Sequence, residues 1–216
     1  KLVVRCSVMG VCGTMRKLSV VLFFALVAFG GAFLGPDLPG IFRAAQIVPN
    51  IIPVAPSRQL EVYYGILNRV SLGEVLTPST VRTAPNSVKC LLCGIRIRDF
   101  LTLVLIDPDA PQPDNPFEAN FLHYMVVNVP GTRFAYGLNA GEVVAEYVGT
   151  QQSLSTSFHR YIYLLYRQPT GRTLFSEPRI PANNTTLRRN FALDTFVSKY
   201  GLELVAGNFF QANPAA

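Results

Sequence analysis

The sequence predicts one mainly β domain with few helices, and two runs of residues carry most of that prediction. Phe100–Ile106 is nearly continuous in apolar residues and ends abruptly at Asp107, which is typical of a central strand covered on both faces. His123–Val129 is rich in β-branched and aromatic residues and stops at Pro130-Gly131, the pattern of a strand followed by a turn. A chain of 216 residues has room for one domain of ordinary size. We therefore expect an antiparallel or mixed sheet at its centre.

Residues 1–34 are interpreted as a leader that precedes the domain. Leu18–Leu34 contains no charged residue and follows Arg16 and Lys17, the order of the basic and apolar regions of a secretory signal peptide. Cleavage after Gly30 or Ala32 would satisfy the preference of signal peptidase for small residues. The charge-free run is also close to the length that spans a bilayer, about 17 to 25 residues. An uncleaved membrane anchor is therefore the alternative interpretation.

The domain itself is expected over residues 59–216, after a Pro-rich segment at 35–58 that we expect to be irregular and to wrap onto the domain. Leu60, Val62 and Tyr64 alternate with other residues, which predicts a strand with one buried face. Further strands are expected at Val143–Val148 and Tyr161–Gln168.

One helix is expected, near the end of the domain. Leu193, Phe196, Val197 and Tyr200 fall at helical spacing. Gly201 is placed to end this helix in the left-handed conformation that glycine adopts without strain. A late helix after several strands agrees with a β domain that has few helices.

The charge of the chain gives little support for a nucleic-acid partner, and none is expected. The formal net charge is +6, but four basic residues (Lys1, Arg5, Arg16 and Lys17) lie in the leader and no acidic residue does. The remaining domain is therefore nearly neutral, at about +2. Its basic residues are scattered, apart from Arg188 and Arg189.

The two cysteines of the domain, Cys90 and Cys93, are more consistent with a structural role than with a metal site. Zinc would need two more ligands nearby, and His123 and His159 are remote in sequence. We expect a structural pair or a local disulfide in an oxidising compartment, with thiol chemistry as the alternative. The overlapping N-glycosylation sequons at 183–186 agree with export.

Three polar residues next to predicted strands are candidates for a site. Asp107 comes directly after the most apolar strand, where a rigid element could hold its carboxylate in a pocket, although Asp-Pro is also a common turn sequence. His123 begins a strand and could equally be a core histidine with a satisfied partner. His159 also leads into a strand and could be an ordinary polar residue at the edge of a sheet. Each signal alone is weak.

Taken together, several segments resemble the phosphatidylethanolamine-binding protein family in order and spacing. The similarity covers about Phe42 to Ala212. The segments that carry it are Leu103–Pro111 (LVLIDPDAP), His123–Gly131 (HYMVVNVPG), Glu146–Gly149 (EYVG), Phe158–Tyr166 (FHRYIYLLY) and Tyr200–Ala212 (YGLELVAGNFFQA). The resemblance implies a large central β-sheet packed on a smaller sheet, few peripheral helices and a small anion-binding cavity.

The resemblance also implies a set of ligand-binding residues. It places Asp107, His123, His159 and Tyr161 around the phosphate of a ligand, and histidine nitrogens and a tyrosine hydroxyl can donate hydrogen bonds to phosphate oxygens. Asp107 would orient or charge an imidazole, or meet the ammonium end of a zwitterionic headgroup. Pro111 would shape the rim, with a cis peptide bond before it, and Gly149 completes the expected set.

The chain departs from the family pattern after Gly149. Members usually have a Gly- and Pro-rich loop there, whereas this chain reads Thr150-Gln151-Gln152-Ser153-Leu154-Ser155. Glycine lets backbone N–H groups approach an anion closely. Replacing it with Gln151 is therefore expected to narrow or re-aim the pocket.

The predicted function is a secreted binding protein for a phosphate-bearing lipid headgroup or another small amphipathic ligand, with no chemical step. The alternative is a regulatory protein that acts by protein contact, such as an inhibitor of serine proteases or a modulator of signalling. An enzyme is not expected, because the sequence has no G-x-S-x-G elbow and no H-E-x-x-H. No cofactor and no metal are expected, and the protein is expected to be a monomer.

Overall fold

The computed structural model describes residues 35–66, 68–134, 137–150 and 157–213. The chain divides into two units, 1–35 and 36–216, and the second unit holds the elements below. The predicted leader at 1–34, with its cleavage sites and the membrane-anchor alternative, lies outside the described residues. Within the described part of the chain, no helix is long and apolar enough to cross a membrane.

A seven-stranded mixed sheet forms the centre of the domain, as predicted. Its strands follow the order β1-β10-β9-β6-β7-β8, and β4 also pairs with β10. The short strands β1 and β4 pair parallel with β10, whereas the long strands pair antiparallel. The bounds are β1 Arg58–Gln59, β4 Glu74–Val75, β6 Phe100–Asp107, β7 Phe121–Pro130, β8 Glu142–Ala145, β9 His159–Gln168 and β10 Glu203–Ala212.

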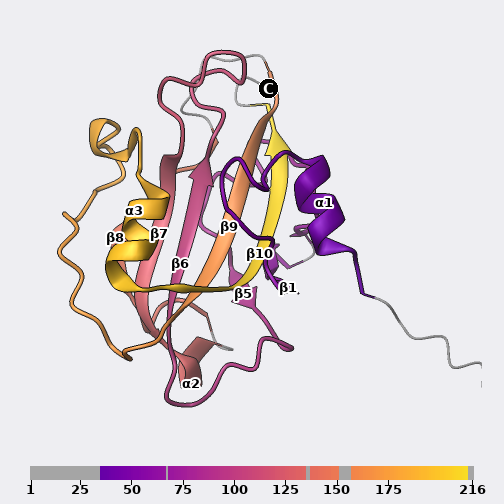
Figure 1. The fold of residues 1–216 in the computed structure, drawn as a ribbon. Helices are drawn as coiled ribbons and strands as arrows, with labels where there is room; N and C mark the ends of the chain where they lie inside the picture. Colours follow the sequence, from indigo (N-terminus) through magenta and orange to yellow (C-terminus); the bar gives the residue numbers. More distant parts are fainter. Residues whose placement is uncertain (1–34, 67, 135–136, 151–156, 214–216) are drawn as a thin grey trace, which may run out of the picture. The chain divides into compact units, whose positions relative to one another are not determined.

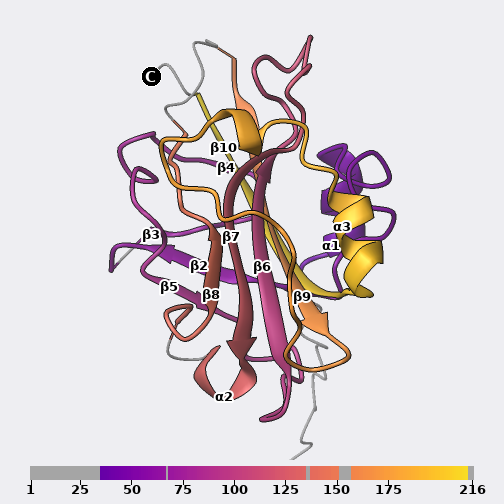
Figure 2. The ribbon, with the colours of Figure 1, turned by 90° about the vertical axis from the view of Figure 1, so that its left-hand side faces the viewer.

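A smaller sheet covers one face of the large one. It has three strands in the order β3-β2-β5, with β2 at Glu61–Tyr64, β3 at Asn68–Arg69 and β5 at Ser87–Lys89. Figure 2 shows this sheet on one side of the large sheet and the helices α1 and α3 on the other. The packing of a large sheet on a smaller one with few helices confirms the predicted fold class.

The core lies in two layers because residues of β6 alternate between the faces of the sheet. Leu101, Leu103 and Leu105 belong to the cluster beneath the small sheet. Val104 and Ile106 belong to the cluster beneath the helices. Both clusters are buried, which confirms the prediction of a central strand covered on both faces and explains why the run is apolar apart from Thr102.

Two helices cover the second face. The helix α3 at Leu193–Tyr200 confirms the late helix, and Gly201 ends it in the left-handed conformation with a φ of 59°. The helix α1 at Leu38–Ala44 falls in the segment that was predicted to be irregular, and that prediction is wrong there. The remaining helical turns are α2 at Gly131–Phe134 and the 3-10 turn η1 at Thr186–Arg188.

The helix α1 forms because its proline lies where a helix tolerates one. Asp37 caps the helix by accepting a hydrogen bond from the backbone N–H of Gly40 at 3.1 Å, and Pro39 lies in the first turn. Phe42 is fully buried and its ring meets that of Phe209 edge-on at 5.4 Å. The prolines that suggested an irregular linker are therefore compatible with a short packed helix (Figure 1).

Most other strand predictions hold, with changes at the ends. β7 and β9 include the predicted segments, whereas β2 begins at Glu61 and leaves out the predicted Leu60. β8 is shorter than the predicted Val143–Val148, since it ends at Ala145. Cys90 and Cys93 form a disulfide with Cα atoms 5.5 Å apart, which confirms the structural pair.

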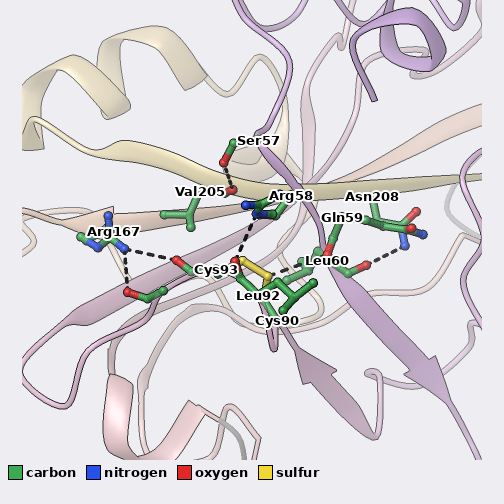
Figure 3. Close-up of a disulfide and its surroundings, with 11 residues drawn as sticks. Ser57, Arg58, Gln59, Leu60, Cys90, Leu92, Cys93, Arg167, Val205 and Asn208 are labelled. Atoms are coloured by element: carbon green, nitrogen blue, oxygen red, sulfur yellow. Dashed lines mark hydrogen bonds between the residues drawn. A yellow bond between two sulfur atoms is a disulfide. The ribbon is translucent and has the colours of Figure 1, made fainter. Parts of the chain in front are cut away.

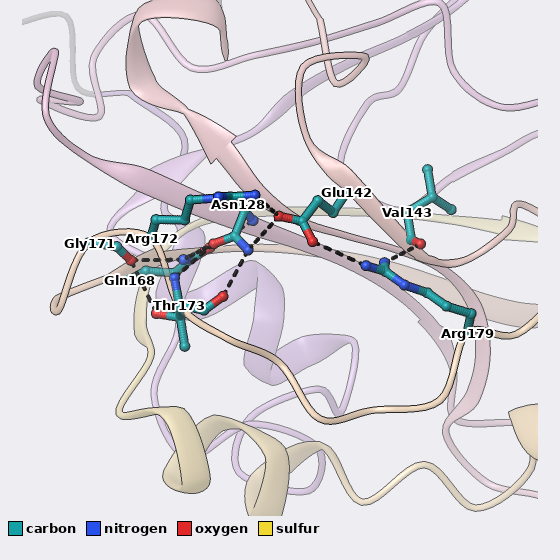
Figure 4. A network of polar contacts seen from close by, with 8 residues as sticks. All are labelled: Asn128, Glu142, Val143, Gln168, Gly171, Arg172, Thr173 and Arg179. Carbon is teal, nitrogen blue, oxygen red and sulfur yellow. Dashed lines mark hydrogen bonds and ion pairs between the residues drawn. The ribbon is translucent and has the colours of Figure 1, made fainter.

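A buried polar network joins β6, β7 and β9 to the loop that follows β9. Gln168 is almost fully buried, and its side-chain oxygen accepts from Thr102 Oγ1 at 2.9 Å and from the N–H of Asn128 at 3.0 Å. Its Nε2 donates to Asn128 Oδ1 at 2.8 Å and to the carbonyl of Gly171 at 3.0 Å. Figure 4 shows that Asn128 continues this network to Glu142. The network satisfies polar groups that burial would otherwise leave without water.

Candidate functional site

The ends of three strands bring the predicted polar residues together. Asp107 ends β6, His123 lies near the start of β7, and His159 and Tyr161 lie at the start of β9. Because β6 is antiparallel to both of its neighbours, its last residues lie opposite the first residues of β7 and β9. All four residues are buried, with exposed fractions of 3% or less.

The carboxylate of Asp107 is the centre of the cluster. Its Oδ2 lies 2.7 Å from His159 Nδ1 and 3.9 Å from His123 Nε2. Its Oδ1 accepts a hydrogen bond of 2.8 Å from the backbone N–H of Asp109. The Asp-Pro sequence therefore forms a turn, as the alternative interpretation of the sequence held, and the same carboxylate also faces both histidines.

His123 is held in one tautomer by a backbone carbonyl. Its Nδ1 lies 2.9 Å from the carbonyl oxygen of Val148, which can only accept, so Nδ1 carries a proton. Burial lowers the pKa of His123, and the charge of Arg188 lowers it further, against the opposite effect of Asp107. The imidazole is therefore neutral near pH 7, with an unprotonated Nε2 toward Asp107.

A small cavity opens beside this cluster. It has a volume of about 20 Å³ and is lined by Asp107, Ala110, Pro111, Glu118, Phe121, His123, Thr150 and Tyr161. That volume is close to what one water molecule requires. Thr150 Oγ1 is buried and has no hydrogen-bond partner among the described residues. Burial, with the charges of Asp107 and Asp109, raises the pKa of Tyr161, so its hydroxyl keeps its proton.

Of the six predicted ligand-binding residues, the structure brings four to this cavity. Asp107, Pro111, His123 and Tyr161 line it, and the bond between Ala110 and Pro111 is cis, which confirms that expectation. His159 is fully buried and does not line the cavity. It supports Asp107 through Nδ1, while its Nε2 has no hydrogen-bond partner among the described residues.

Gly149 lies next to the cavity but does not line it. A Cβ at this position would meet the carbonyl oxygen of Val81 at 3.0 Å and the Cα of Arg82 at 3.1 Å. Glycine is therefore suited to this position because another stretch of backbone approaches it closely. The predicted effect of Gln151 concerns residues 151–155, which lie outside the described residues.

Two polar residues that sequence reasoning missed hold the cavity in place. Asp109 is buried and accepts from the backbone N–H and the Nε of Arg160, each at 2.8 Å. Arg160 in turn donates from Nη1 to the carbonyl of Ala45 at 2.8 Å. This bridge ties the loop after β6 to the end of α1. Asp109 is part of the DPDAP segment, so its position next to Asp107 was the available signal.

Arg188 is the second positive group near the cluster. It is fully buried and donates to the carbonyls of Leu122 at 2.9 Å and Pro181 at 3.0 Å, with longer contacts to His123 at 3.4 Å and Ile180 at 3.5 Å. Its charge thus lies directly behind His123. The sequence showed only a pair of basic residues at this point, without any sign that one of them is buried.

The described residues contain no group of three His, Cys, Asp or Glu side chains that could hold a metal ion. The expectation that no metal is bound stays a prediction. What the cluster can do chemically is to accept hydrogen bonds at Asp107 and Glu118 and to donate them from the hydroxyls of Thr150 and Tyr161.

Comparison with known proteins identifies a family. Residues 80–210 match the family model described as phosphatidylethanolamine-binding protein. The chain is 37% identical over 158 residues to the protein TERMINAL FLOWER 1 of Arabidopsis thaliana, which covers 73% of this chain and 80% of that protein.

A secreted protein and an inhibitor are also similar to this chain. The 26 kDa secreted antigen of Toxocara canis is 30% identical over 176 residues, which covers 79% of this chain and 62% of the antigen. A carboxypeptidase Y inhibitor, solved in complex with its cognate proteinase, is similar with a TM-score of 0.64 at 22% identity, covering 81% of this chain and 93% of the inhibitor. The second likeness shows a shared fold.

Proposed function

Because this chain belongs to the phosphatidylethanolamine-binding protein family, we propose that it is a secreted binding protein for a small phosphate-bearing or amphipathic ligand. The site is the cavity beside Asp107, and binding involves no chemical step. The observation that carries the proposal is the convergence of Asp107, His123 and Tyr161, from three different strands, on one cavity.

The charges at the cavity favour a zwitterionic ligand over a bare anion. The hydroxyls of Thr150 and Tyr161 are donors suited to phosphate oxygens, and the charge of Arg188 behind His123 adds to the attraction. Asp107 lies on the same cavity and would repel an anion, but it would attract an ammonium group. Glu118 lies there too, with Arg189 paired to it at 3.0 Å. A headgroup that carries both charges, such as phosphorylethanolamine, matches this distribution.

His159 has a supporting role in this proposal. Its Nδ1 fixes one oxygen of Asp107 while the N–H of Asp109 fixes the other, so the carboxylate cannot rotate freely. The cavity volume of about 20 Å³ admits only the end of a ligand. The remainder of the ligand would lie at the surface of the domain.

Replacing Tyr161 with Phe is expected to weaken binding of glycerophosphoethanolamine by about 10-fold or more, because one hydrogen bond to a charged phosphate oxygen of the ligand is lost. The affinity is measured by NMR titration, following the ring signals of His123. The ring of Tyr161 stacks on that of Phe210 at 5.0 Å, and Phe keeps this contact.

Tyr163→Phe is the matched control. Tyr163 lies two residues further along β9 and does not line the cavity. Its hydroxyl shares a hydrogen bond with the hydroxyl of Tyr64. Its substitution is expected to leave the affinity within about twofold of the unsubstituted protein. Equal affinities for the Tyr161→Phe and Tyr163→Phe proteins would show that the cavity is not the binding site.

Secretion rests on the leader, on the similarity to a secreted antigen and on the exposed position of the sequons. Asn183 is exposed, whereas the side chain of Asn184 accepts a hydrogen bond from the N–H of Leu187 at 3.1 Å. Asn183 is therefore the better acceptor for a glycan.

Protein recovered from a secretory host is expected to begin after Gly30 or Ala32 and to carry a glycan at Asn183, as measured by intact mass and peptide mapping. Thr185→Ala removes the sequon of Asn183 and keeps that of Asn184, so the glycan should disappear. Thr186→Ala does the reverse, and its glycan should remain. An unmodified chain that still contains Leu18–Leu34 would contradict both parts of this expectation.

Regulation by protein contact is the second candidate. The carboxypeptidase Y inhibitor shares this fold, and it was solved bound to a proteinase. The test is whether this chain inhibits a proteinase. Inhibition that is unchanged in the Tyr161→Phe protein and by added glycerophosphoethanolamine would favour the second candidate over the first.

A further inference from the structure

The disulfide-closed turn between β5 and β6 presents two leucines to solvent. Leu91 and Leu92 are 77% and 78% exposed, although they lie between the bonded Cys90 and Cys93. Figure 3 shows Arg58 and Arg167 close to this turn. Arg58 Nε donates to the carbonyl of Leu92 at 3.1 Å. The backbone of the turn is therefore fixed while its apolar side chains point away from the core.

A second turn at the same end of the domain exposes another apolar side chain. Ile97 is 82% exposed, and its turn is held by a 2.8 Å hydrogen bond from the N–H of Arg96 to Asp99 Oδ2. Arg167 joins the two turns, because its Nε contacts the same Asp99 oxygen at 3.1 Å and its Nη2 donates to the carbonyl of Gly94 at 3.4 Å. Scattered exposed apolar residues are ordinary, but neighbouring ones on two braced turns are not.

Basic residues surround these apolar side chains. Lys89, Arg96, Arg98 and Arg133 are exposed, and no ion pair is seen for any of them within the part of the chain that the structure describes. The acidic groups nearby are fewer. Asp99 and Glu203 both pair with Arg167, and Glu61 lies opposite Lys89 across the β2–β5 pair. The surface therefore carries a net positive charge.

We propose that this surface, formed by Leu91, Leu92 and Ile97 with Lys89, Arg96 and Arg98, docks on membranes that contain anionic lipids. Leucine and isoleucine side chains gain free energy by entering the boundary between headgroups and acyl chains. Arginine and lysine beside them meet the negative charge of the headgroups. The apolar side chains lie on two turns whose surroundings carry a net positive charge, and a negatively charged bilayer surface complements that arrangement.

The docking surface and the ligand cavity lie at opposite ends of the same strands. β6 begins beside this surface at Phe100 and ends at Asp107, and eight residues of strand span about 25 Å. In Figure 1, α2, which carries Arg133, lies at one end of the large sheet and the end of β10 lies at the other. A docked molecule would thus hold its cavity away from the bilayer, so docking is independent of the ligand proposed above.

Sedimentation with vesicles tests the proposal. The full chain is mixed with vesicles of phosphatidylcholine, or of phosphatidylcholine with phosphatidylserine, at low and at high salt. Binding is expected to the phosphatidylserine vesicles and to weaken at high salt. The Arg96→Gln/Arg98→Gln protein should bind these vesicles about 25-fold more weakly, at about fivefold for each arginine. The Leu91→Ser/Leu92→Ser protein should bind at least about 10-fold more weakly to the same vesicles.

Matched controls come from exposed residues elsewhere. Leu187 is 48% exposed on η1, near the cavity end of β7, and Arg43 is exposed on α1. Leu187→Ser and Arg43→Gln should both bind as the unsubstituted chain does. All variants share the same N-terminus, so differences between them are independent of residues 1–34.

The proposal is overturned if the unsubstituted chain does not distinguish the two vesicle types, or if the control variants lose as much binding as the variants of the surface. It is also overturned if both surface variants, with unchanged melting temperatures, bind as well as the unsubstituted chain. The Tyr161→Phe protein should bind the vesicles as the unsubstituted chain does. Loss of vesicle binding can therefore be distinguished from loss of ligand binding at the cavity.

Discussion

Replacing Arg188 with Met is expected to lower the free energy of unfolding by about 3 kcal/mol, as measured by urea denaturation at neutral pH. The guanidinium donates to the carbonyls of Leu122 and Pro181 and contacts the carbonyls of His123 and Ile180, and the side chain is fully buried. Methionine fills much of the volume but donates nothing, so these carbonyls lose their partner. Burial lowers the pKa of Arg188, so part of this loss is offset by removing a buried charge.

Arg189→Met is the control for the loss of a neighbouring arginine. Its side chain is 46% exposed and forms an ion pair of 3.0 Å with Glu118. Exposed pairs contribute about 0 to 1 kcal/mol, so the loss of stability should be small. Only Arg188→Met should also raise the pKa of His123 in an NMR titration, since the charge of Arg188 lowers that pKa. A stability loss below that of Arg189→Met would show that the buried guanidinium is not what joins η1 to β7.

Gln168→Ala is expected to cost about 3 kcal/mol or more of unfolding free energy, as measured in the same way. The substitution removes two acceptor contacts, to Thr102 and the N–H of Asn128, and two donor contacts, to Asn128 Oδ1 and Gly171. These partners are in the interior, where a lost hydrogen bond is not replaced by water.

The matched control is Gln211→Ala on β10, whose side chain is half-buried and makes one long hydrogen bond of 3.4 Å to the carbonyl of Gly73. Its cost should be below about 1 kcal/mol. A double-mutant cycle that combines Gln168→Ala with Asn128→Ala tests whether the two side chains stabilise the fold together. Members of one hydrogen-bond network should show a coupling free energy of about 1 to 3 kcal/mol. Strictly additive losses would show that Gln168 and Asn128 act independently.

The local patterns of the sequence predicted the central architecture because they report burial and backbone conformation directly. The nearly continuous apolar run at Phe100–Ile106, broken by Thr102, is typical of a strand covered on both faces, and β6 has that position. Gly201 marked the end of α3 for an equally local reason, since glycine adopts the left-handed conformation without strain. The helix α1 was missed because prolines in a first helical turn look the same in sequence as prolines in a loop.

The candidate site was predicted in part. Asp107, His123 and Tyr161 were selected because they match family motifs, and they do line one cavity. His159 was selected on the same basis, but its ring lies behind Asp107 and not on the cavity. A motif gives the order of residues, and it does not give the direction in which each side chain points once strands pair.

The sequence by itself determined the strands β2, β6, β7, β8 and β9, the late helix, the family and the residues gathered at the end of β6, because periodicity and motif are properties of neighbouring residues. The strands β1, β3, β4, β5 and β10 emerged only from the structure. Only the tertiary structure decided that Arg188 is buried behind His123, that Gln168 and Asn128 share one network, and that Leu91 and Ile97 emerge at one basic end of the domain. These relations join residues that are far apart in the chain, or they depend on how the surrounding side chains pack. They depend on strand register and side-chain direction, which arise only when all the strands are paired at once.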